Sequence, residues 1–257
     1  MGGALLAGWL AKGMRGPFVA VEPNRGAVAG FAGKPGVTLV EASEQIPADF
    51  APDVVLVALK PQTTDANLPA YRRFARALFV SIAAGKTLGA FARLLGADTA
   101  VVRTIPNTPA QLGRGITVAC ANAHVGAAQR ALAQELLEAV GEVGWVEDEA
   151  LIDAATAVSG SGPAYVFLLA ECLAAAGAAQ GLPPALAARL ARVTVAGAGE
   201  LLHRSSEAPE ALRAAVTSPA GTTAAALAIL MADAGLRDLM IRAVAAATKR
   251  SQELASA

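Results

Sequence analysis

The chain has 257 residues, of which 54% are hydrophobic and 16% charged, and its 21 basic side chains match 21 acidic ones. This length suits one large domain or two ordinary ones. Because there is no basic excess to neutralise phosphates, the composition argues against nucleic acid as the main partner. Low charge and abundant alanine indicate a large buried surface, which for this size favours a subunit interface over a solitary monomer.

The first half alternates short apolar strands with helices. After an opening helix at 4–12, strands are predicted at 18–22, 37–40, 54–59, 78–82 and 101–105. A later pair of strands at 115–121 and 143–146 flanks a helix at 126–140. Continuous apolar strands that alternate with helices are typical of a parallel sheet covered on both faces, so we predict an α/β fold.

The start of the chain lacks one expected feature. A doubly wound dinucleotide-binding fold opens with a strand, a G-x-G-x-x-G turn and a helix, whereas Met1-Gly2-Gly3 leads directly into the helix. If Gly2 is the third glycine of that fingerprint, an acidic ribose ligand is expected about 20 residues later. Glu22 stands there, at the end of a predicted strand. The alternative is an ordinary helix N-terminus followed by an exposed glutamate.

Loops after the later strands carry further candidates, because ligands of an open parallel sheet bind at the carboxyl ends of its strands. In the first, Ala58-Leu59-Lys60-Pro61, the lysine would meet a cofactor phosphate or hydroxyl, or is simply solvated. The next strand leads into a loop that contains Ala83. In the third, two prolines around Asn107 make a stiff loop suited to placing a ring.

From Glu147 onward the residues predict helices only. They are expected at 151–158, 164–177, 185–203, 208–215, 223–234 and 236–254. The run Ser159–Gly162 is either a plain interhelix break or a backbone-lined wall of an active site. We therefore predict a Rossmann-like domain over 1–147 and an all-helical domain over 148–257 that forms an interlocked dimer core.

One polar stretch, LRAAVTSPAGTTAAAL at 212–227, interrupts the helical half. Pro219 and Gly221 predict a turn, and Thr222–Thr223 is expected to cap the next helix. A helix start can hold a carboxylate, which the hydroxyls of Ser218 and both threonines would also face. The alternative is an ordinary capped turn between two core helices.

Other features limit the class of protein. Cys120 and Cys172 have no partner at metal-ligand spacing, so we expect no metal site and two small core residues in a reduced compartment. His124 and His203 are expected at the surface. The opening segment lacks the charged region of a signal peptide and fails the myristoylation pattern, and the uncharged run 213–233 is a poor membrane span. We expect a soluble, cytoplasmic protein.

Four motifs together carry a family resemblance: VTSPAGTTAAAL, RTIPNTPA, SGSGPAY and the opening MGGALLAG. In this order, across essentially the whole chain, they resemble pyrroline-5-carboxylate reductase. The resemblance implies hydride transfer from NADPH or NADH to the C5=N bond of 1-pyrroline-5-carboxylate, giving L-proline in the last step of proline biosynthesis. It also implies a Rossmann domain, a helical domain interlocked with a second subunit, and a homodimer or higher homo-oligomer.

The resemblance also implies roles for residues. Thr223 would hydrogen-bond the ring nitrogen and Ser218 would help form the catalytic pocket. The other substrate-binding residues would be Val216, Thr217, Ala220, Gly221 and Thr222. The cofactor-binding residues would be Gly2, Glu22, Asn24, Arg25, Ala58, Lys60, Pro61, Ala83 and Asn107.

Two departures from the family pattern are evident. Ala220-Gly221 stands where the family has two glycines, which should be tolerable only if Ala220 avoids positive φ. The first strand with its two glycines is absent, as in a truncated or mis-started chain, so we expect exposed sheet edges and weak cofactor binding.

Some alternatives stay open. Glu22 favours NADH, because a carboxylate repels a 2′-phosphate, whereas Asn24-Arg25 favours NADPH. No His–Asp or Cys–His couple has suggestive spacing, which fits hydride transfer rather than hydrolysis. The rival functions are another cyclic-imine or ketimine reductase and a non-catalytic nucleotide-sensing dimer.

Overall fold

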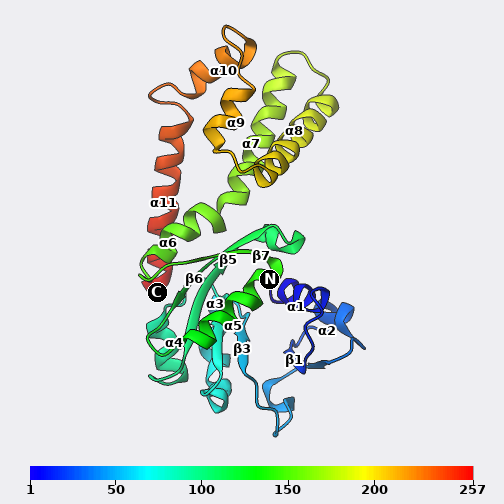
Figure 1. Ribbon diagram of the computed structural model, residues 1–257, viewed down its shortest axis with the longest axis vertical. Helices are drawn as coiled ribbons and strands as arrows, with labels where there is room; N and C mark the ends of the chain where they lie inside the picture. Colours follow the sequence, from blue (N-terminus) through cyan, green and yellow to red (C-terminus); the bar gives the residue numbers. More distant parts are fainter. Residues whose placement is uncertain (257) are drawn as a thin grey trace. The chain divides into compact units, whose positions relative to one another are not determined.

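The computed structural model describes residues 1–256, which fall into two compact units. The first unit holds residues 1–160 together with the end of the last helix from Thr248, and the second holds Ser161–Ala247. All strands belong to the first unit, and the second is helical (Figure 1). The predicted α/β class with an all-helical C-terminal part is confirmed. The predicted functional boundary at 147/148 stays a prediction.

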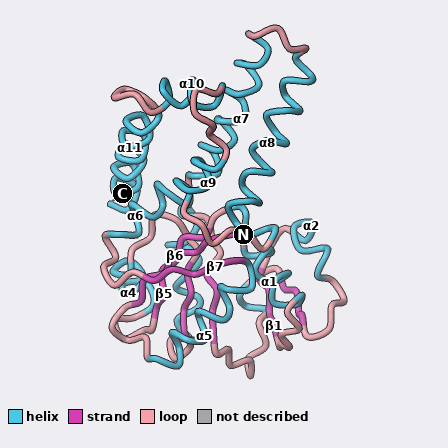
Figure 2. Tube along the Cα trace, turned by 45° about the horizontal axis from the view of Figure 1, so that its top comes forward, coloured by secondary structure: helices cyan, strands magenta, loops and turns pink. Residues whose placement is uncertain are grey.

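Within the described residues, the strands form two sheets. β1 (Phe18–Val21) and β2 (Val37–Val40) make a parallel pair, and a larger sheet has the order β3-β4-β5-β6-β7. Its strands are β3 (Val54–Val57), β4 (Leu78–Ser81), β5 (Val101–Pro106), β6 (Gly115–Ala121) and β7 (Gly141–Trp145). Figure 2 shows the strands in magenta. Every predicted strand is present, with ends shifted by at most two residues.

One strand pairing departs from the predicted parallel sheet. β3, β4 and β5 are parallel neighbours, but β5 pairs with β6 in the antiparallel sense, and β7 then runs parallel to β6. Only the 3-10 helix Thr108–Leu112 and its flanking residues join β5 to β6. A parallel pair needs a crossover of a dozen or more residues, so this short connection returns the chain antiparallel.

The sheet is interrupted where a doubly wound fold would place its first strand. Such a fold has the strand order 3-2-1-4-5-6. Here β2 and β1 correspond to positions 3 and 2, and β3, β4 and β5 correspond to positions 4, 5 and 6. Within residues 1–256, no ladder joins β1 to β3, so each strand keeps one edge without a partner. No strand of the described residues fills position 1 between β1 and β3.

Six α-helices belong wholly to the described part of the first unit. They are α1 (Gly2–Ala11), α2 (Arg25–Val28), α3 (Pro61–Asn67), α4 (Leu88–Leu95), α5 (Ala127–Leu137) and α6 (Leu151–Ala155). α3 and α4 lie in the crossovers from β3 to β4 and from β4 to β5. On one side of the sheet, Phe79 of β4 and Phe91 of α4 are fully buried together with Leu68 and Leu95.

Helix α1 joins the two sheets by packing. Leu5 is buried with Leu78 of β4, and Phe18 of β1 packs against the same cluster. The Trp9 ring stacks on Phe18 with centroids 5.8 Å apart. The Trp9 indole N–H also donates to the Leu136 carbonyl oxygen at 2.8 Å, which ties α1 to α5. One apolar cluster of the first unit therefore contains residues from both sheets.

The second unit consists of helices that leave their apolar side chains exposed. Its elements are α7 (Gly162–Ala179), α8 (Pro184–Arg204), α9 (Pro209–Ala215), α10 (Thr222–Leu230) and most of α11 (Leu236–Ser256). α7 and α8 lie side by side, and a β-carbon added to Gly177 would come within 3.3 Å of the Ala187 side chain (Figure 2). Of residues 161–247, all of which the structure describes, only Ala187 and Ala191 are buried.

Two smaller expectations were wrong. The predicted break at Ser159–Gly162 is wrong in extent: Ser159 and Gly160 belong to a π-helical turn, Thr156–Gly160, in which the Ser159 hydroxyl donates to the Ala155 carbonyl oxygen at 2.8 Å, and only Ser161 separates this turn from α7. Cys172 lies exposed on α7 rather than in a core, whereas Cys120 is buried as expected. His124 and His203 lie at the surface, as expected.

One helical stretch in the described residues, Leu151–Ala179, is long and apolar enough to cross a membrane by length and composition alone. It is not the run 213–233 considered from the sequence. Apolar helices of soluble proteins pass the same test, so this finding is weak evidence of a membrane span.

Candidate active site

The predicted cofactor residues of the first unit lie at the carboxyl ends of its parallel strands. β1 is followed by Glu22, Asn24 and Arg25, β3 by Ala58, Lys60 and Pro61, β4 by Ala83, and β5 by Asn107. Gly2 begins α1. Open α/β sheets bind ligands at this edge, so the fold places these residues where a nucleotide site is expected.

Gly2 lies close to the end of β3. A β-carbon added to Gly2 would come within 2.8 Å of the Ala58 β-carbon, a distance that side chains do not tolerate. Met1 is the N-cap of α1, and no side chain caps the helix, so the first N–H groups stay available to a ligand. A helix start that approaches a strand end this closely, with free N–H groups, suits a phosphate.

The residues after β1 form a hydrogen-bonded loop. The Asn24 backbone N–H donates to the Glu22 carboxylate at 2.9 Å, and the Asn24 side-chain oxygen caps α2 by accepting the Gly26 N–H at 3.1 Å. Arg25 forms an ion pair with Glu41, just beyond β2, although 85% of its side chain is exposed. Exposed ion pairs contribute only about 0–1 kcal/mol, so Arg25 can exchange this partner for a ligand phosphate.

The other strand-end residues differ in how firmly they are held. Lys60 is exposed, and its ammonium has no ion-pair partner among residues 1–256. Ala83 is buried, and its N–H donates to the Ser81 hydroxyl at 3.2 Å. The Asn107 side-chain oxygen accepts the Ile116 N–H at 3.0 Å, which fixes the loop between β5 and β6. Lys60 thus offers an unpaired ammonium at this edge, whereas the Asn107 side chain is held by a hydrogen bond.

In the second unit, the turn Ser218–Gly221 separates α9 from α10. The Gly221 N–H donates to the Ser218 carbonyl oxygen at 3.1 Å, which closes a four-residue turn. Pro219 stands at its second position, and Ala220 has φ +57°, the conformation that a type II turn requires at its third position. The condition that Ala220 should avoid positive φ is therefore not met. Among the described residues, it alone combines positive φ with a side chain.

The start of α10 differs by one residue from the prediction. Gly221, not a threonine, is the N-cap, and no side chain caps the helix. Thr222 and Thr223 are the first two helical residues, so their hydroxyls are not used as caps. A β-carbon on Gly221 would come within 2.4 Å of the Ser218 hydroxyl, so the glycine lets Ser218 fold against the helix start. Ser218 is exposed and Thr223 is half-buried.

The remaining predicted substrate residues, Val216 and Thr217, lie between α9 and the turn. The Thr217 hydroxyl donates to the Arg213 carbonyl oxygen at 2.6 Å, which closes the end of α9. The Val216 side chain is 70% exposed. The structure therefore gathers the predicted substrate residues on one turn and helix start, with free N–H groups and hydroxyls on the same segment.

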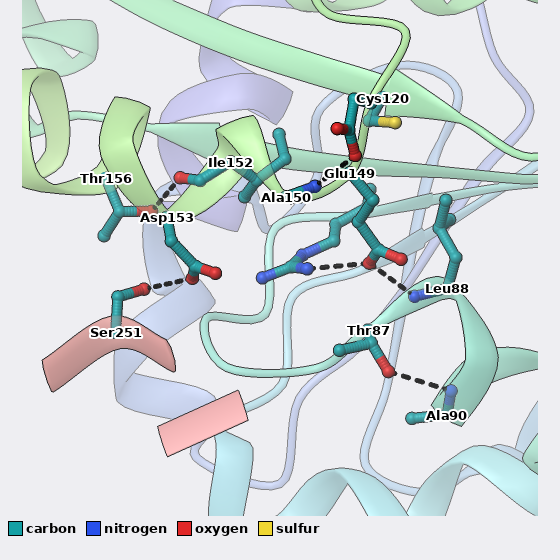
Figure 3. Close-up of polar contacts among 12 residues, drawn as sticks. Thr87, Leu88, Ala90, Cys120, Glu149, Ala150, Ile152, Asp153, Thr156 and Ser251 are labelled. Atoms are coloured by element: carbon teal, nitrogen blue, oxygen red, sulfur yellow. Dashed lines mark hydrogen bonds and ion pairs between the residues drawn. The ribbon is translucent and has the colours of Figure 1, made fainter. Parts of the chain in front are cut away.

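One polar cluster in the first unit was not indicated by the sequence. Glu149 accepts hydrogen bonds from Arg103 of β5 and from the Leu88 N–H, which begins α4 (Figure 3). Nearby, the Ser251 hydroxyl of α11 donates to the buried Asp153 carboxylate at 2.6 Å. The sequence held one signal for this cluster: Arg103 stands inside the apolar run VVRTIP, and a buried arginine needs an acidic partner.

Cys120 lies beside this cluster. Burial raises the pKa of the Cys120 thiol, and the Glu149 and Glu147 carboxylates raise it further. The thiol therefore stays protonated at neutral pH and is a poor nucleophile.

The first unit also contains a cleft of about 510 Å³. It is lined by Met1 and one face of α1, by residues after β5, and by the end of the segment before β7: Met1, Ala4, Ala7, Gly8, Ala11, Ala110, Gln111, Gly113, Ala139 and Val140. None of the predicted site residues lines it, although it lies next to the Asn107 loop.

Known proteins resemble this chain along its length. The family model "Pyrroline-5-carboxylate reductase dimerisation" matches residues 149–254. A pyrroline-5-carboxylate reductase from Pseudomonas aeruginosa is 42% identical over 99% of this chain and 93% of its own length. The solved structure of a pyrroline-5-carboxylate reductase from Coxiella burnetii is 34% identical, with a TM-score of 0.89 over 98% of this chain and 93% of that one.

A second solved structure, pyrroline carboxylate reductase from Plasmodium falciparum with NADP bound, is 26% identical. Its TM-score is 0.79, over 99% of this chain and 94% of that one. The full-length identity to the Pseudomonas enzyme and the matched dimerisation region agree with the split Rossmann sheet and the helical unit described above. The chain belongs to the pyrroline-5-carboxylate reductase family.

Proposed function

We propose that this protein reduces 1-pyrroline-5-carboxylate to L-proline with a hydride from NADPH or NADH, as the last step of proline biosynthesis. The observation that carries this proposal is the 42% identity to a pyrroline-5-carboxylate reductase over 99% of the chain. The strand-end residues of the first unit and the hydroxyl-bearing turn of the second unit supply suitable groups for a dinucleotide and an imino acid.

The second unit would hold the substrate. The carboxylate of the imino acid would accept N–H groups at the start of α10, where no side chain competes for them. The Thr223 hydroxyl would hydrogen-bond the ring nitrogen, and Ser218 would complete the pocket from the turn. A protonated cyclic imine is already electrophilic, so orientation accounts for most of the catalytic effect.

The first unit would hold the cofactor. The close approach of Gly2 to Ala58 and the uncapped start of α1 fit a pyrophosphate, and the unpaired Lys60 fits a phosphate or hydroxyl. When bound, NADPH or NADH supplies the hydride for the imine carbon. The Ala83 backbone and the Asn107 side-chain amide would line the same carboxyl-end edge of the sheet.

The preference between the two cofactors depends on the loop after β1. The Glu22 carboxylate already accepts the Asn24 N–H, and Arg25 is held only by an exposed ion pair. We therefore infer that Arg25 binds the 2′-phosphate of NADPH and that NADPH is the better cofactor. In steady-state assays, Arg25→Ala should lower kcat/KM for NADPH several-fold and leave NADH nearly unchanged; equal losses would contradict this inference.

We also propose that the protein works in the cytoplasm as a homodimer or larger homo-oligomer, without a membrane or nucleic-acid partner. The exposed apolar helices of the second unit support a subunit interface. Both cysteines are free thiols, which is usual in a reducing compartment.

The proposed activity has a direct test. Purified protein is mixed with NADPH, with or without pyrroline-5-carboxylate, and absorbance at the nicotinamide band and proline formation are followed together. NADPH oxidation should depend on the imine and match proline one to one. A panel with other cyclic imines and ketimines separates the alternative reductases: faster turnover of another member would reassign the substrate. If no imine is reduced, the proposed activity is wrong.

A further inference from the structure

The loop after β4 connects the sheet to α4 and carries one of the predicted cofactor residues. It runs from Ile82 to Thr87 and contains Ala83. Gly85 turns it with φ +72°. The Thr87 hydroxyl accepts the Ala90 N–H at 3.2 Å and so caps α4 (Figure 3). The position of Ala83 therefore depends on what holds the two ends of this loop.

Glu149 contacts one end of the loop directly and reaches the other end through Arg103. Its Oε1 atom accepts the Leu88 N–H at 2.7 Å, directly after the loop. The same oxygen accepts a hydrogen bond from Arg103 Nη1 at 2.7 Å. In the β4–β5 ladder, Arg103 is the register partner of Ser81, the last residue before the loop. One carboxylate thus joins the strand end and the helix start that flank the loop.

The Arg103–Glu149 pair is rigid because it is largely buried. The Arg103 side chain is 3% exposed and that of Glu149 29%. Arg103 Nε is buried and has no hydrogen-bond partner in the described part of the chain, so Glu149 is the acceptor on which this guanidinium depends. A buried charge is held to its partner much more firmly than an exposed one, because separating them leaves the charge unpaired.

Two weaker contacts restrain the middle of the loop. Lys86 pairs with Asp65 of α3 at 2.8 Å, but 62% of the aspartate side chain is exposed. Gly85 lies against α11, where an added β-carbon would be 3.5 Å from the Leu254 carbonyl oxygen. These contacts limit the swing of the loop, whereas Glu149 fixes its ends.

We propose that Glu149 is a positioning residue for the cofactor: by joining Arg103 to the Leu88 N–H, it sets the position of the Ile82–Thr87 loop against bound NAD(P)H. This inference rests on the proposed function, because Ala83 contacts the cofactor only if that function is right. Glu149 itself touches neither cofactor nor substrate in this role. Its loss should therefore weaken cofactor binding and leave the KM for pyrroline-5-carboxylate nearly unchanged.

The test distinguishes the effect of anchoring the loop on NADPH affinity from the effect of leaving a buried charge unpaired. Glu149→Gln alone would strand the Arg103 charge and could unfold the protein, so two double variants are compared. Arg103→Met with Glu149→Gln removes both charges but keeps an acceptor for the Leu88 N–H. Arg103→Met with Glu149→Leu removes the charges and the acceptor. NADPH affinity is measured by fluorescence titration, and folding by the melting temperature.

We expect the Leu-bearing variant to bind NADPH about ten-fold more weakly than the Gln-bearing one. Hydrogen exchange should also show the Leu88 amide less protected in the Leu-bearing variant. Glu147→Gln is the matched control. Glu147 lies two residues before Glu149 and forms an exposed ion pair with Arg130, so this change breaks a nearby ion pair without touching the loop. The NADPH affinity of this variant should equal that of the unmodified chain. Equal NADPH affinities of the two double variants would overturn this inference but not the proposed function. Failure of the unmodified chain to bind NADPH would overturn the proposed function as well.

Discussion

The two units of this chain use apolar side chains in opposite ways. In the first unit, Leu5, Leu78, Phe79 and Phe91 are completely buried within one chain. In the second, α7, α9 and α10 have no buried residue among those described, although α7 carries the run Val166–Leu169. The Phe167 side chain is 63% exposed. A helix that is apolar around much of its surface is stable only when another element covers it.

The contrast indicates that the first unit buries its apolar core within one chain, whereas the second needs another chain. The match of residues 149–254 to a dimerisation family gives the covering element: the same region of a second copy. In the proposed function, the helical unit would combine two tasks, subunit contact and substrate binding, whereas the sheet unit would have one, cofactor binding.

Breaking the subunit contact should have the largest effect. Phe167→Asp would bury an unpaired carboxylate twice in a symmetric interface, so we expect the dimer dissociation constant to rise at least about 100-fold. Light scattering after size-exclusion chromatography measures this, with Phe167→Leu as the control that keeps an apolar side chain. A dimer that persists in the Asp variant would show that α7 is covered in some other way.

A second change should affect the chemistry of the helical unit alone. Thr223→Ala removes the hydroxyl proposed for the ring nitrogen, so kcat should fall about 100-fold, the usual size for one lost hydrogen bond to a changing charge. The melting temperature and NADPH affinity should stay the same, because the hydroxyl caps no helix. Thr223→Ser should recover most of the activity. Unchanged turnover in the Ala variant would refute the assigned role.

The sheet unit should respond to completion of its sheet. A segment with a β-strand and a glycine-rich turn, placed ahead of Met1, would pair with the free edges of β1 and β3 and add N–H groups for the pyrophosphate. We expect NADPH affinity to rise about ten-fold or more. A segment of equal length with prolines at alternate positions cannot pair and serves as the control. Equal NADPH affinity with and without the strand would contradict the expectation of weak binding.

The smallest effect concerns the backbone of the substrate turn. Ala220→Gly should stabilise the protein by about 0.5–1 kcal/mol, since positive φ costs alanine about 1–2 kcal/mol and the entropy of glycine in the unfolded chain offsets part of that gain. The same change at Ala214, inside α9, should instead destabilise by about 1 kcal/mol. Thermal unfolding compares the two; a loss of stability at Ala220 would mean that its backbone is not strained.

Local sequence patterns determined most of the fold. Apolar runs such as VVLVAL predicted the strands, because a strand covered on both faces needs little more than a short continuous run of apolar residues. The antiparallel β5–β6 pair could not be read in this way, because the direction of a strand depends on its connection. The break between α6 and α7 was predicted too long, because Ser159 and Gly160, which are typical of loops, belong to the π-helical turn Thr156–Gly160.

The site could be predicted where residues suited to ligand binding stand next to residues with strong backbone preferences in the sequence. Pro219 and Gly221 predicted the turn before α10, and strand ends predicted the edge that carries Lys60 and Asn107. The roles of these residues stay predictions. The positive φ of Ala220 was missed, because turn closure over Pro219 imposes it against the preference of alanine. Glu149 was missed because its partners, Arg103 and Leu88, are 46 and 61 residues away in sequence.

The most direct test of hydride transfer to an imino acid follows the hydride itself. NADPH deuterated at the transferable C4 position is incubated with pyrroline-5-carboxylate and the protein, and the proline formed is analysed by NMR and mass spectrometry. The account predicts one deuterium per proline, at C5 and on a single face. Proline without deuterium, deuterium at another carbon, or no proline at all would contradict it.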